Sequence, residues 1–387
     1  MSSAPRRVCF LHSSAGRYGA DRQLELLATG LDPERWRPLV VLPMEGPLSV
    51  ALRDAGVEVF TGPLAVLRRE LLTLRGATEL GGLLHNQAPS LGNLLRLHDV
   101  DLVHANTSVI LGARGPARAA GARLVTHVRE IYPEVPGLWP AHRAQLLRSD
   151  AVVCVSRATR APLGDAGHVR VIHDGLAIEV ARAPRVEARL ALGIPRDAFV
   201  VAMLGRISAW KGQEVLARAL AEPVLAELGA IGVVAGDAWP GQDHHERSLR
   251  ELGASLGLGD RLRLVGFRND VDTIYGAADV IAVPSTRPDP FPNSALEAAA
   301  AGCCVVAAAH GGLPEIVREG VTGRLVAPGD HRALAGALAD LAKHPRKVAR
   351  LGGAAAEDAR RRFTPERMLE QIAALYEELL TRRPARR

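Results

Sequence analysis

The stretch from Pro284 to Gly302 (PSTRPDPFPNSALEAAAAG) brings two carboxylates together with an expected helix start. Asp289 stands in its Pro-rich part, and Glu297 follows in an Ala-rich part that we expect to be helical from Asn293-Ser294 onward. Carboxylates accept hydrogen bonds from sugar hydroxyls, and the amides of a helix N-terminus favour phosphate. A loop acid, fresh helix amides and an acid in the first helical turn are therefore typical of a site for a hydroxylated, phosphorylated ligand.

The same residues also fit an interpretation in which they only shape the chain. Ser294 and Glu297 form the pattern S-x-x-E, the capping box, in which the Glu297 carboxylate would bind the backbone amide of Ser294. Asp289, between prolines in RPDP, would then be an ordinary turn residue. These residues alone leave both interpretations open.

Two cations lie upstream in the sequence GRISAWKGQ. Arg206 follows the apolar run Phe199–Leu204 almost directly, and Lys211 precedes a helical segment. A guanidinium at a strand end and an ammonium near a helix start suit a diphosphate. A strand-turn-helix junction with incidental surface cations is the alternative. The pattern GxxxxGK[ST] is absent, so the segment is not a P-loop.

Other motifs follow expected strands in the same way. The Gly311–Glu315 turn (GGLPE) permits a tight turn or a close backbone approach to a ligand. The loop His12–Asp21, which contains Gly19, opens a helix and can approach a phosphate. His104 and His127 each end an expected strand, and a structural role is open for both. His127 is the better catalytic candidate, because a long Pro-rich loop follows it.

His244 and His245 are adjacent on an expected helix and point about 100° apart. A solvated helix start therefore fits them better than a metal site.

Short apolar runs alternate with helical segments over nearly the whole chain. The runs expected as strands in the first half are Arg7–His12, Arg37–Leu42, Val57–Phe60, Leu102–Ala105, Arg123–His127 and Ala151–Val155. Those in the second half are Phe199–Leu204, Ile231–Ala235, Leu262–Val265, Val280–Val283, Cys304–Ala307 and Gly323–Val326. Apolar strands separated by helices predict parallel sheets covered on both faces.

We therefore predict an α/β protein of two doubly wound Rossmann-like domains that face each other across a cleft. The first would span residues 1–175 and the second 176–363, with the restart between His173 and Pro195. The amphipathic segment Phe363–Leu380 would form a helix that crosses back to the first domain, so that residues 364–387 complete it. Ligands of such sheets bind beyond the carboxyl ends of the strands.

The bulk composition narrows the class of protein. A chain of 387 residues with 48% hydrophobic residues favours two domains with large cores. No apolar run reaches about 18 residues and the N-terminus lacks a signal-peptide pattern, so we expect a cytoplasmic protein. The four cysteines lack metal-ligand spacing and fit buried thiols in a reducing cytosol.

The net charge of +6 allows several partners. It fits a solvated Arg-rich surface, or a basic face toward anionic lipid or a phosphorylated acceptor. Nucleic acid is disfavoured, because no basic stretch is interleaved with aromatics. Leu64–Leu97, with Arg68, Arg69, Arg75 and Arg96, fits an amphipathic helix on the sheet better than a helix pair on a membrane surface.

Together these motifs resemble the GT-B glycosyltransferases of family GT4, a retaining and metal-independent group. GRISAWKGQ resembles the phosphate-binding turn of the family, and RLRLVGFRNDVDTIYGAADVIAVPS resembles its nucleotide-pocket strand, loop and helix. PDPFPNSALEAAAAGCCVVAAAHGGLPEIVREG resembles its E-x7-E block and the GG-x-PE turn that follows. The first half fits more loosely, through Gly19-Ala20-Asp21-Arg22, DLVHAN and VTHVRE.

The resemblance implies roles around the donor phosphates. Arg206 and Lys211 would bind the donor diphosphate. Backbone amides near Asn293 and Ser294 would also contact the donor, and the loop at Gly19 would approach a phosphate from the first domain.

It also implies roles around the sugar and the base. Glu297 would bind the ribose hydroxyls, and Asp289 would bind hydroxyls of the transferred sugar. His127 would touch that sugar from the opposing domain. Phe267 and Arg268 would line the base pocket, largely through backbone.

The sequence departs from the family pattern in two ways. Asp289 is one methylene shorter than the glutamate usual there. Pro290 and Pro292 stand where glycine is common, and Pro292 has no N–H to donate to the sugar.

The implied activity is transfer of a hexose from a UDP- or GDP-sugar to an acceptor hydroxyl, with retention and without a metal or other cofactor. The donor-binding domain would be the second and the acceptor-binding domain the first. The acceptor would be a glycolipid, an oligosaccharide or a small molecule, with a peripheral contact to the inner face of the cell membrane left open. The alternatives are a UDP-GlcNAc 2-epimerase-like enzyme and a non-catalytic sugar-nucleotide-binding protein.

Overall fold

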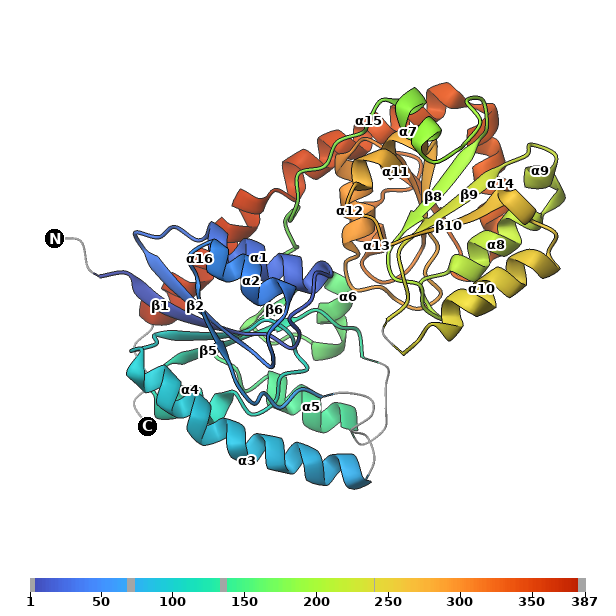
Figure 1. Ribbon diagram of the computed structural model, residues 1–387. Helices are drawn as coiled ribbons and strands as arrows, with labels where there is room; N and C mark the ends of the chain where they lie inside the picture. Colours follow the sequence, from blue (N-terminus) through green and yellow to red (C-terminus); the bar gives the residue numbers. More distant parts are fainter. Residues whose placement is uncertain (1–3, 68–73, 133–137, 240, 382–387) are drawn as a thin grey trace. The chain divides into compact units, whose positions relative to one another are not determined.

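A computed structural model describes residues 4–67, 74–132, 138–239 and 241–381. The chain divides into two compact units, Met1–Ala177 with Pro365–Arg387, and Ile178–Thr364. The expected division was between residues 175 and 176. Each unit contains one parallel β-sheet flanked by helices (Figure 1).

The sheet of the first unit has seven strands in the order β3-β2-β1-β4-β5-β6-β7. These strands are β1 (Arg6–Leu11), β2 (Trp36–Leu42), β3 (Glu58–Thr61), β4 (Leu102–Ala105), β5 (Arg123–Val128), β6 (Ala151–Cys154) and β7 (Val169–Val171). The first six match the expected runs to within one residue. The sequence analysis missed β7, because its three residues include the exposed Arg170 and so make no apolar run.

The sheet of the second unit has six strands in the order β10-β9-β8-β11-β12-β13. These strands are β8 (Val200–Leu204), β9 (Ile231–Ala235), β10 (Leu262–Gly266), β11 (Val280–Val283), β12 (Cys304–Ala308) and β13 (Gly323–Val326). All six were expected. Both sheets are doubly wound, because the chain proceeds outward from β1 and from β8 in one direction and then returns to build the other side.

Helices cover both faces of each sheet. Those of the first unit are α1 (Gly19–Gly30), α2 (Pro47–Asp54), α3 (Leu74–Leu97), α4 (Arg114–Ala119), α5 (Leu138–Leu146), α6 (Arg157–Arg160) and α16 (Pro365–Thr381). Those of the second unit are α7 (Arg185–Ala191), α8 (Gln213–Ala221), α9 (Pro223–Ala226), α10 (His244–Ser255), α11 (Val271–Ala277), α12 (Asn293–Ala300), α13 (Leu313–Ile316), α14 (His331–Lys343) and α15 (Pro345–Arg362).

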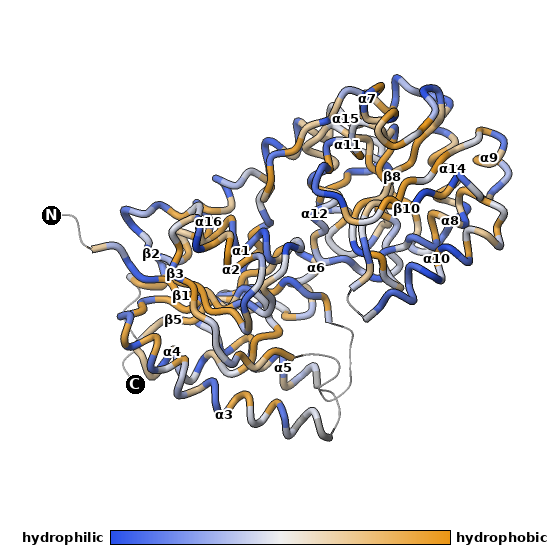
Figure 2. The backbone as a smooth tube through the Cα atoms, in the orientation of Figure 1, coloured by the Kyte–Doolittle hydropathy of each residue, from blue (hydrophilic) through white to orange (hydrophobic). Residues whose placement is uncertain are grey.

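Strand β1 shows why two helical layers are needed. Val8 and Phe10 belong to the apolar cluster that contains residues of α1, α2 and α16, whereas Cys9 and Leu11 belong to the cluster that contains residues of α3. Alternate residues of a strand point to opposite faces, so an uninterrupted apolar strand needs cover on both. The strands labelled in Figure 2 are accordingly largely orange, the hydrophobic colour.

The last helix, α16, returns to the first unit as expected. Its apolar face is buried in the cluster that also holds residues of α1, and α16 lies beside α1 (Figure 1). The buried residues are Met368, Ile372, Leu375, Tyr376 and Leu379. Tyr376 packs edge-on against Trp36 at the start of β2.

Helix α3 packs on the sheet through its second half, where Leu91 and Leu95 are buried. Packing is thus confirmed for this half, whereas Arg68 and Arg69 lie outside the described residues and the contact with a membrane stays a prediction. Within the described ranges, no helix is long and apolar enough to cross a membrane.

All four cysteines are buried free thiols, as expected from their apolar contexts. Burial raises the pKa of Cys303 to about 11 and that of Cys304 to about 12, so both thiols stay protonated at neutral pH.

The packing of α16 makes the stability of the first unit depend on that helix. Ile372→Ala removes a side chain with no exposed surface and should lower the free energy of unfolding by about 2–5 kcal/mol. Gln371→Ala, at an exposed position of the same helix, should leave it within about 0.5 kcal/mol. Urea denaturation followed by tryptophan fluorescence measures both. Equal small losses would show that the helix does not hold the unit together.

Candidate functional site

The order of strands in the second sheet brings the two predicted motifs together. Strand β8 pairs with β11, so the segment after β8, with Arg206 and Lys211, adjoins the segment after β11, with Asp289. Strand order reverses at β8, and such a switch point is where doubly wound sheets bind ligands. The amide of Thr286 donates to the Trp210 carbonyl over 2.7 Å and joins the two segments directly.

Lys211 and Asp289 form an ion pair, with 2.7 Å between Nζ and Oδ2. The Asp289 side chain is 5% exposed and that of Lys211 23%, and the Ser285 hydroxyl lies 3.4 Å from the same carboxylate oxygen. Sequence analysis singled out both residues but treated them separately. Their pairing gives each residue a structural role in addition to any role in ligand binding.

Arg206 lies against an aromatic ring that the sequence analysis missed. Its guanidinium carbon is 3.8 Å from the ring centroid of Trp239, a cation–π distance. Trp239 follows Gly236-Asp237-Ala238 at the carboxyl end of β9, so its position after an apolar strand was the available signal. The Arg206 carbonyl accepts from the Gln213 side-chain amide over 2.8 Å, which fixes the turn to the first residue of α8.

Buried polar atoms without a partner gather at the ends of β8 and β9. Among the described residues, Ser208 Oγ, Gln213 Oε1 and Asp237 Oδ1 are buried and make no hydrogen bond. Leaving a buried polar atom unsatisfied costs about 1–3 kcal/mol, and proteins rarely tolerate several together. This cluster is therefore suited to a polar ligand.

Glycines allow the backbone to close tightly around this region. Gly212 has φ of +91°, and a Cβ there would lie 2.0 Å from the Pro284 carbonyl oxygen. A Cβ on Gly311 would lie 2.3 Å from the Asp289 carbonyl oxygen, and the Gly312 amide donates to that carbonyl over 2.7 Å. The Gly311–Glu315 turn thus holds the Asp289 loop in place.

Helix α12 begins at Asn293, as expected, with Pro292 as the residue before it. Ser294 is the second helical residue and not the cap, so the capping-box interpretation does not describe this helix. Glu297 is the fifth residue and so lies just beyond the first turn, in which it was expected. It is 7% exposed and accepts from the Tyr275 hydroxyl over 3.2 Å.

The residues expected at the base pocket follow β10. Phe267 is 46% exposed, and Arg268 binds the Asp270 carboxylate, with 2.9 Å between Nε and Oδ1. The Arg268 side chain is held by Asp270, so this residue suits a contact to the base through its backbone. Phe267 is open to solvent, so its ring surface and its backbone are both accessible. Their role stays a prediction.

In the first unit, Gly19 is the exposed first residue of α1, at the end of the loop that follows β1. Asp21 anchors this loop, because its carboxylate binds the Tyr18 amide over 2.8 Å and His12 Nε2 over 3.0 Å. The side-chain amide of Asn106, just after β4, lies 3.2 Å from the other ring nitrogen of His12. The segments after the neighbouring strands β1 and β4 are thereby joined.

His127 and His104 occupy the ends of β5 and β4, and both are fully buried. His104 binds the Tyr376 hydroxyl, so the structural interpretation holds for it. His127 Nε2 has no hydrogen-bond partner among the described residues. Burial, followed by the charge of Arg129, lowers the pKa of His127 well below its usual range, so the ring is neutral at pH 7.

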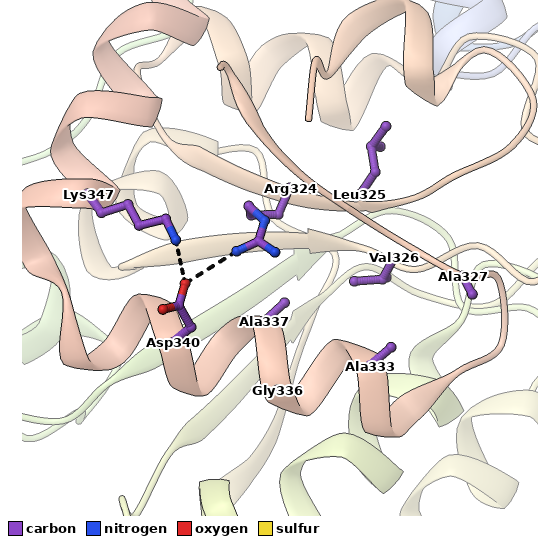
Figure 3. A pocket seen from close by; sticks show the side chains of 9 residues that line it. All are labelled: Arg324, Leu325, Val326, Ala327, Ala333, Gly336, Ala337, Asp340 and Lys347. Carbon is purple, nitrogen blue, oxygen red and sulfur yellow. Dashed lines mark hydrogen bonds and ion pairs between the residues drawn. The ribbon is translucent and has the colours of Figure 1, made fainter. Parts of the chain in front are cut away.

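A groove of about 530 Å³ lies elsewhere in the second unit, between β13, α14 and α15. Its charged groups are paired with one another: Asp340 lies 2.6 Å from Lys347 Nζ and 3.3 Å from Arg324 Nη1 (Figure 3). It contains none of the unpartnered buried atoms that mark the ends of β8 and β9. We therefore place the candidate site at those strand ends.

His244 and His245 begin α10, with ring centroids 4.1 Å apart. Within the described ranges, no group of three or more His, Cys, Asp or Glu residues is placed to hold a metal. That the protein works without a metal stays a prediction.

The chain belongs to the family 4 type of glycosyltransferases with the GT-B fold. The model of the family "Glycosyl transferases group 1" matches residues 185–358, and that of "Glycosyltransferase Family 4" matches residues 18–180. The two matches follow one another along the chain, one in each unit, as the resemblance of the motifs implied.

Relatives and solved structures agree with this membership. The D-inositol 3-phosphate glycosyltransferase of Saccharomonospora viridis is 39% identical over 219 residues, 55% of this chain and 50% of the relative. The chain spans about half the length of the curated relatives it matches. Anabaena HepE, solved with UDP and glucose, has a TM-score of 0.81 and 27% identity over 96% of this chain and 99% of its own. Sucrose-phosphate synthase of Thermosynechococcus elongatus, at 22% identity over 97% of this chain and 99% of its own, shares the fold with a TM-score of 0.78.

The Lys211–Asp289 pair predicts strong coupling between two residues of the site. Lys211→Met leaves a buried carboxylate without its cation and should lower the free energy of unfolding by about 2–4 kcal/mol. Adding Asp289→Asn should restore most of this loss, because no uncompensated charge remains. Chemical denaturation of the two single variants and the double variant gives the coupling energy. Additive losses would show that the pair is not formed in solution.

Proposed function

We propose that the protein transfers a hexose from a nucleotide diphosphate sugar to a hydroxyl of an acceptor. The observation that carries the proposal is the cluster at the ends of β8, β9 and β11. The switch point of a doubly wound sheet there holds three features. They are the cation–π contact of Arg206 with Trp239, the Lys211–Asp289 ion pair and three buried polar atoms without a partner among the described residues. Membership of the family 4 type of glycosyltransferases supports the reaction class.

Arg206 would stabilise the leaving group. As the bond between the sugar carbon and the diphosphate breaks, negative charge grows on the departing oxygen, and a preorganised cation in a partly buried site lowers that barrier. Arg206 suits this role because its carbonyl is fixed by Gln213 and its guanidinium by the ring of Trp239. The amides at the start of α12 would contribute to the same end.

Lys211 and Asp289 would bind different parts of the donor. The ammonium of Lys211 has three donors, so it can bind a phosphate oxygen while it keeps Asp289 in place. The other oxygen of Asp289 would accept from a hydroxyl of the transferred sugar. Glu297, held by Tyr275, would bind the ribose hydroxyls.

The transfer would proceed with retention and without a metal. The acceptor oxygen bonds to the anomeric carbon on the face that the diphosphate leaves, and the acceptor proton passes to the departing phosphate. Atoms and charges then balance with a nucleoside diphosphate as the second product, and no covalent enzyme intermediate is needed.

The donor would be a UDP- or GDP-sugar. Complexes of Anabaena HepE with UDP and with UDP-glucose, at 28% identity to this chain, favour uridine. The acceptor would be a glycolipid, an oligosaccharide or a small polyol bound by the first unit. A phosphorylated polyol fits the net charge of +6 and the D-inositol 3-phosphate in the names of the relatives.

Arg206→Ala should reduce transfer by at least about 100-fold, with little change in thermal stability. Arg218→Ala, at an exposed position of the adjacent α8, is the matched control and should retain full activity. Release of nucleoside diphosphate in the presence of candidate acceptors measures both. Near-normal activity of Arg206→Ala would remove this residue from the reaction.

A thermal-shift screen should identify the donor. UDP or GDP and the matching sugar nucleotides should raise the melting temperature, because a ligand that binds only the folded state stabilises it according to its affinity. ADP-sugars should not, and EDTA should leave the shift unchanged. A shift that requires added Mg²⁺ would contradict the metal-free mechanism, and no shift with any nucleotide would contradict the donor class.

A further inference from the structure

A chain of polar side chains runs through the core of the first unit, from α16 to the end of β5. The Tyr376 hydroxyl binds Nδ1 of His104, and Nε2 of His104 lies 3.2 Å from Nδ1 of His127. All three side chains are fully buried. Tyr376 stands 272 positions after His104 in the sequence, so the contact exists only because α16 returns to this unit.

Arg129 determines which atoms donate and which accept in this series of hydrogen bonds. Its Nη2 lies 3.5 Å from Nδ1 of His127, and a guanidinium can only donate. Arg129 is itself fixed, because Nη1 binds the Asp174 carboxylate at 2.6 Å and Nε donates to the Asn106 carbonyl over 3.0 Å. Nδ1 of His127 therefore faces two nitrogen neighbours, of which at least one is a permanent donor.

A neutral imidazole carries one N–H, and the other nitrogen accepts. Since Nδ1 of His127 faces a donor, its proton belongs on Nε2. His104 must then donate from its own Nε2 and accept the Tyr376 hydroxyl at Nδ1. Burial and the nearby Arg129 charge lower the pKa of His104 to about 3, so neither ring gains a second proton near neutral pH.

The outcome is an N–H of His127 that is buried and has no acceptor among the described residues. We propose that Tyr376, His104 and Arg129 are positioning residues, which hold His127 in the Nε2-protonated form so that it donates a hydrogen bond to an oxygen of the bound substrate. The identification of that oxygen as a sugar hydroxyl rests on the proposed function. The direction of the hydrogen bonds does not.

The helix α16 thereby acquires a second role. Its apolar face stabilises the unit, while the buried Tyr376 hydroxyl donates to Nδ1 of His104 and so supports the tautomer that Arg129 requires. The Tyr376 ring is held for this by Trp36, and the His104 ring by Phe10, with ring centroids 5.3 Å apart in both pairs. A phenylalanine at position 376 would pack equally well but would leave His104 Nδ1 without a donor.

Long-range 1H–15N correlation spectra of the full chain, labelled with 15N-histidine, report which ring nitrogen carries the proton. Signals are assigned by their loss in His104→Gln and His127→Gln. We expect both rings to be neutral and protonated at Nε2 between about pH 6 and 8. A proton on Nδ1 of His127 would overturn the proposal. The tautomer is read from the unmodified chain without substrate, and the variants serve only to assign the signals.

Two substitutions separate positioning from packing. His104→Leu removes the nearer of the two donors that face Nδ1 of His127 and leaves only the longer contact of 3.5 Å to Arg129. It should therefore produce mixed tautomers of His127 and lower kcat about tenfold, with the donor KM within about twofold. His104→Gln keeps a donor and an acceptor and should restore the Nε2 tautomer and most of kcat. Ser149→Ala, which removes the buried hydrogen bond to Thr126 in the same sheet, is the control and should change neither.

The results distinguish this proposal from the proposed function. If the unmodified chain shows the Nε2 tautomer but transfers no sugar with any donor, the function fails while the hydrogen-bond direction stands. If the chain is an active transferase and His104→Leu and His104→Gln lose kcat equally without a change in the His127 tautomer, the positioning role fails while the function stands.

Discussion

The pairing of β8 with β11 is the constraint on which the candidate site depends. Because the two strands are neighbours in a parallel sheet, the segments that leave their carboxyl ends must share one edge. Arg206, Lys211 and Asp289 meet there although Asp289 lies far from the others in sequence. The Lys211–Asp289 ion pair, the Thr286 amide bond to Trp210 and the close contact of Gly212 with Pro284 all follow from that adjacency.

Much of this arrangement could be predicted from the sequence, because its elements are local. Uninterrupted apolar runs located twelve of the thirteen strands of the described residues to within one residue. The exception is β7, because Arg170 divides its three residues. The start of α12 at Asn293 could also be predicted, since Pro292 ends the loop that precedes it.

The partners of the site residues could not be predicted in the same way. The ion pair of Lys211 with Asp289, the stacking of Arg206 on Trp239 and the contact of Tyr376 with His104 join residues distant in the chain. One sequence pattern also pointed to two outcomes. S-x-x-E is equally a capping box and a ligand-binding helix, and only the helix boundary at Asn293 distinguishes them. The glycines of the Gly311–Glu315 turn pack against the backbone of the Asp289 loop. Their conformational freedom permits this contact, but the sequence alone does not specify it.

The central claim is that the ends of β8, β9 and β11 bind the diphosphate of a sugar nucleotide. A crystal structure of the chain with UDP or a UDP-sugar tests it most directly. The account predicts phosphate oxygens within hydrogen-bonding distance of Arg206 and of the first amides of α12, with the ribose hydroxyls at Glu297. A nucleotide bound elsewhere, or one whose phosphates leave Arg206 and α12 untouched, would contradict it.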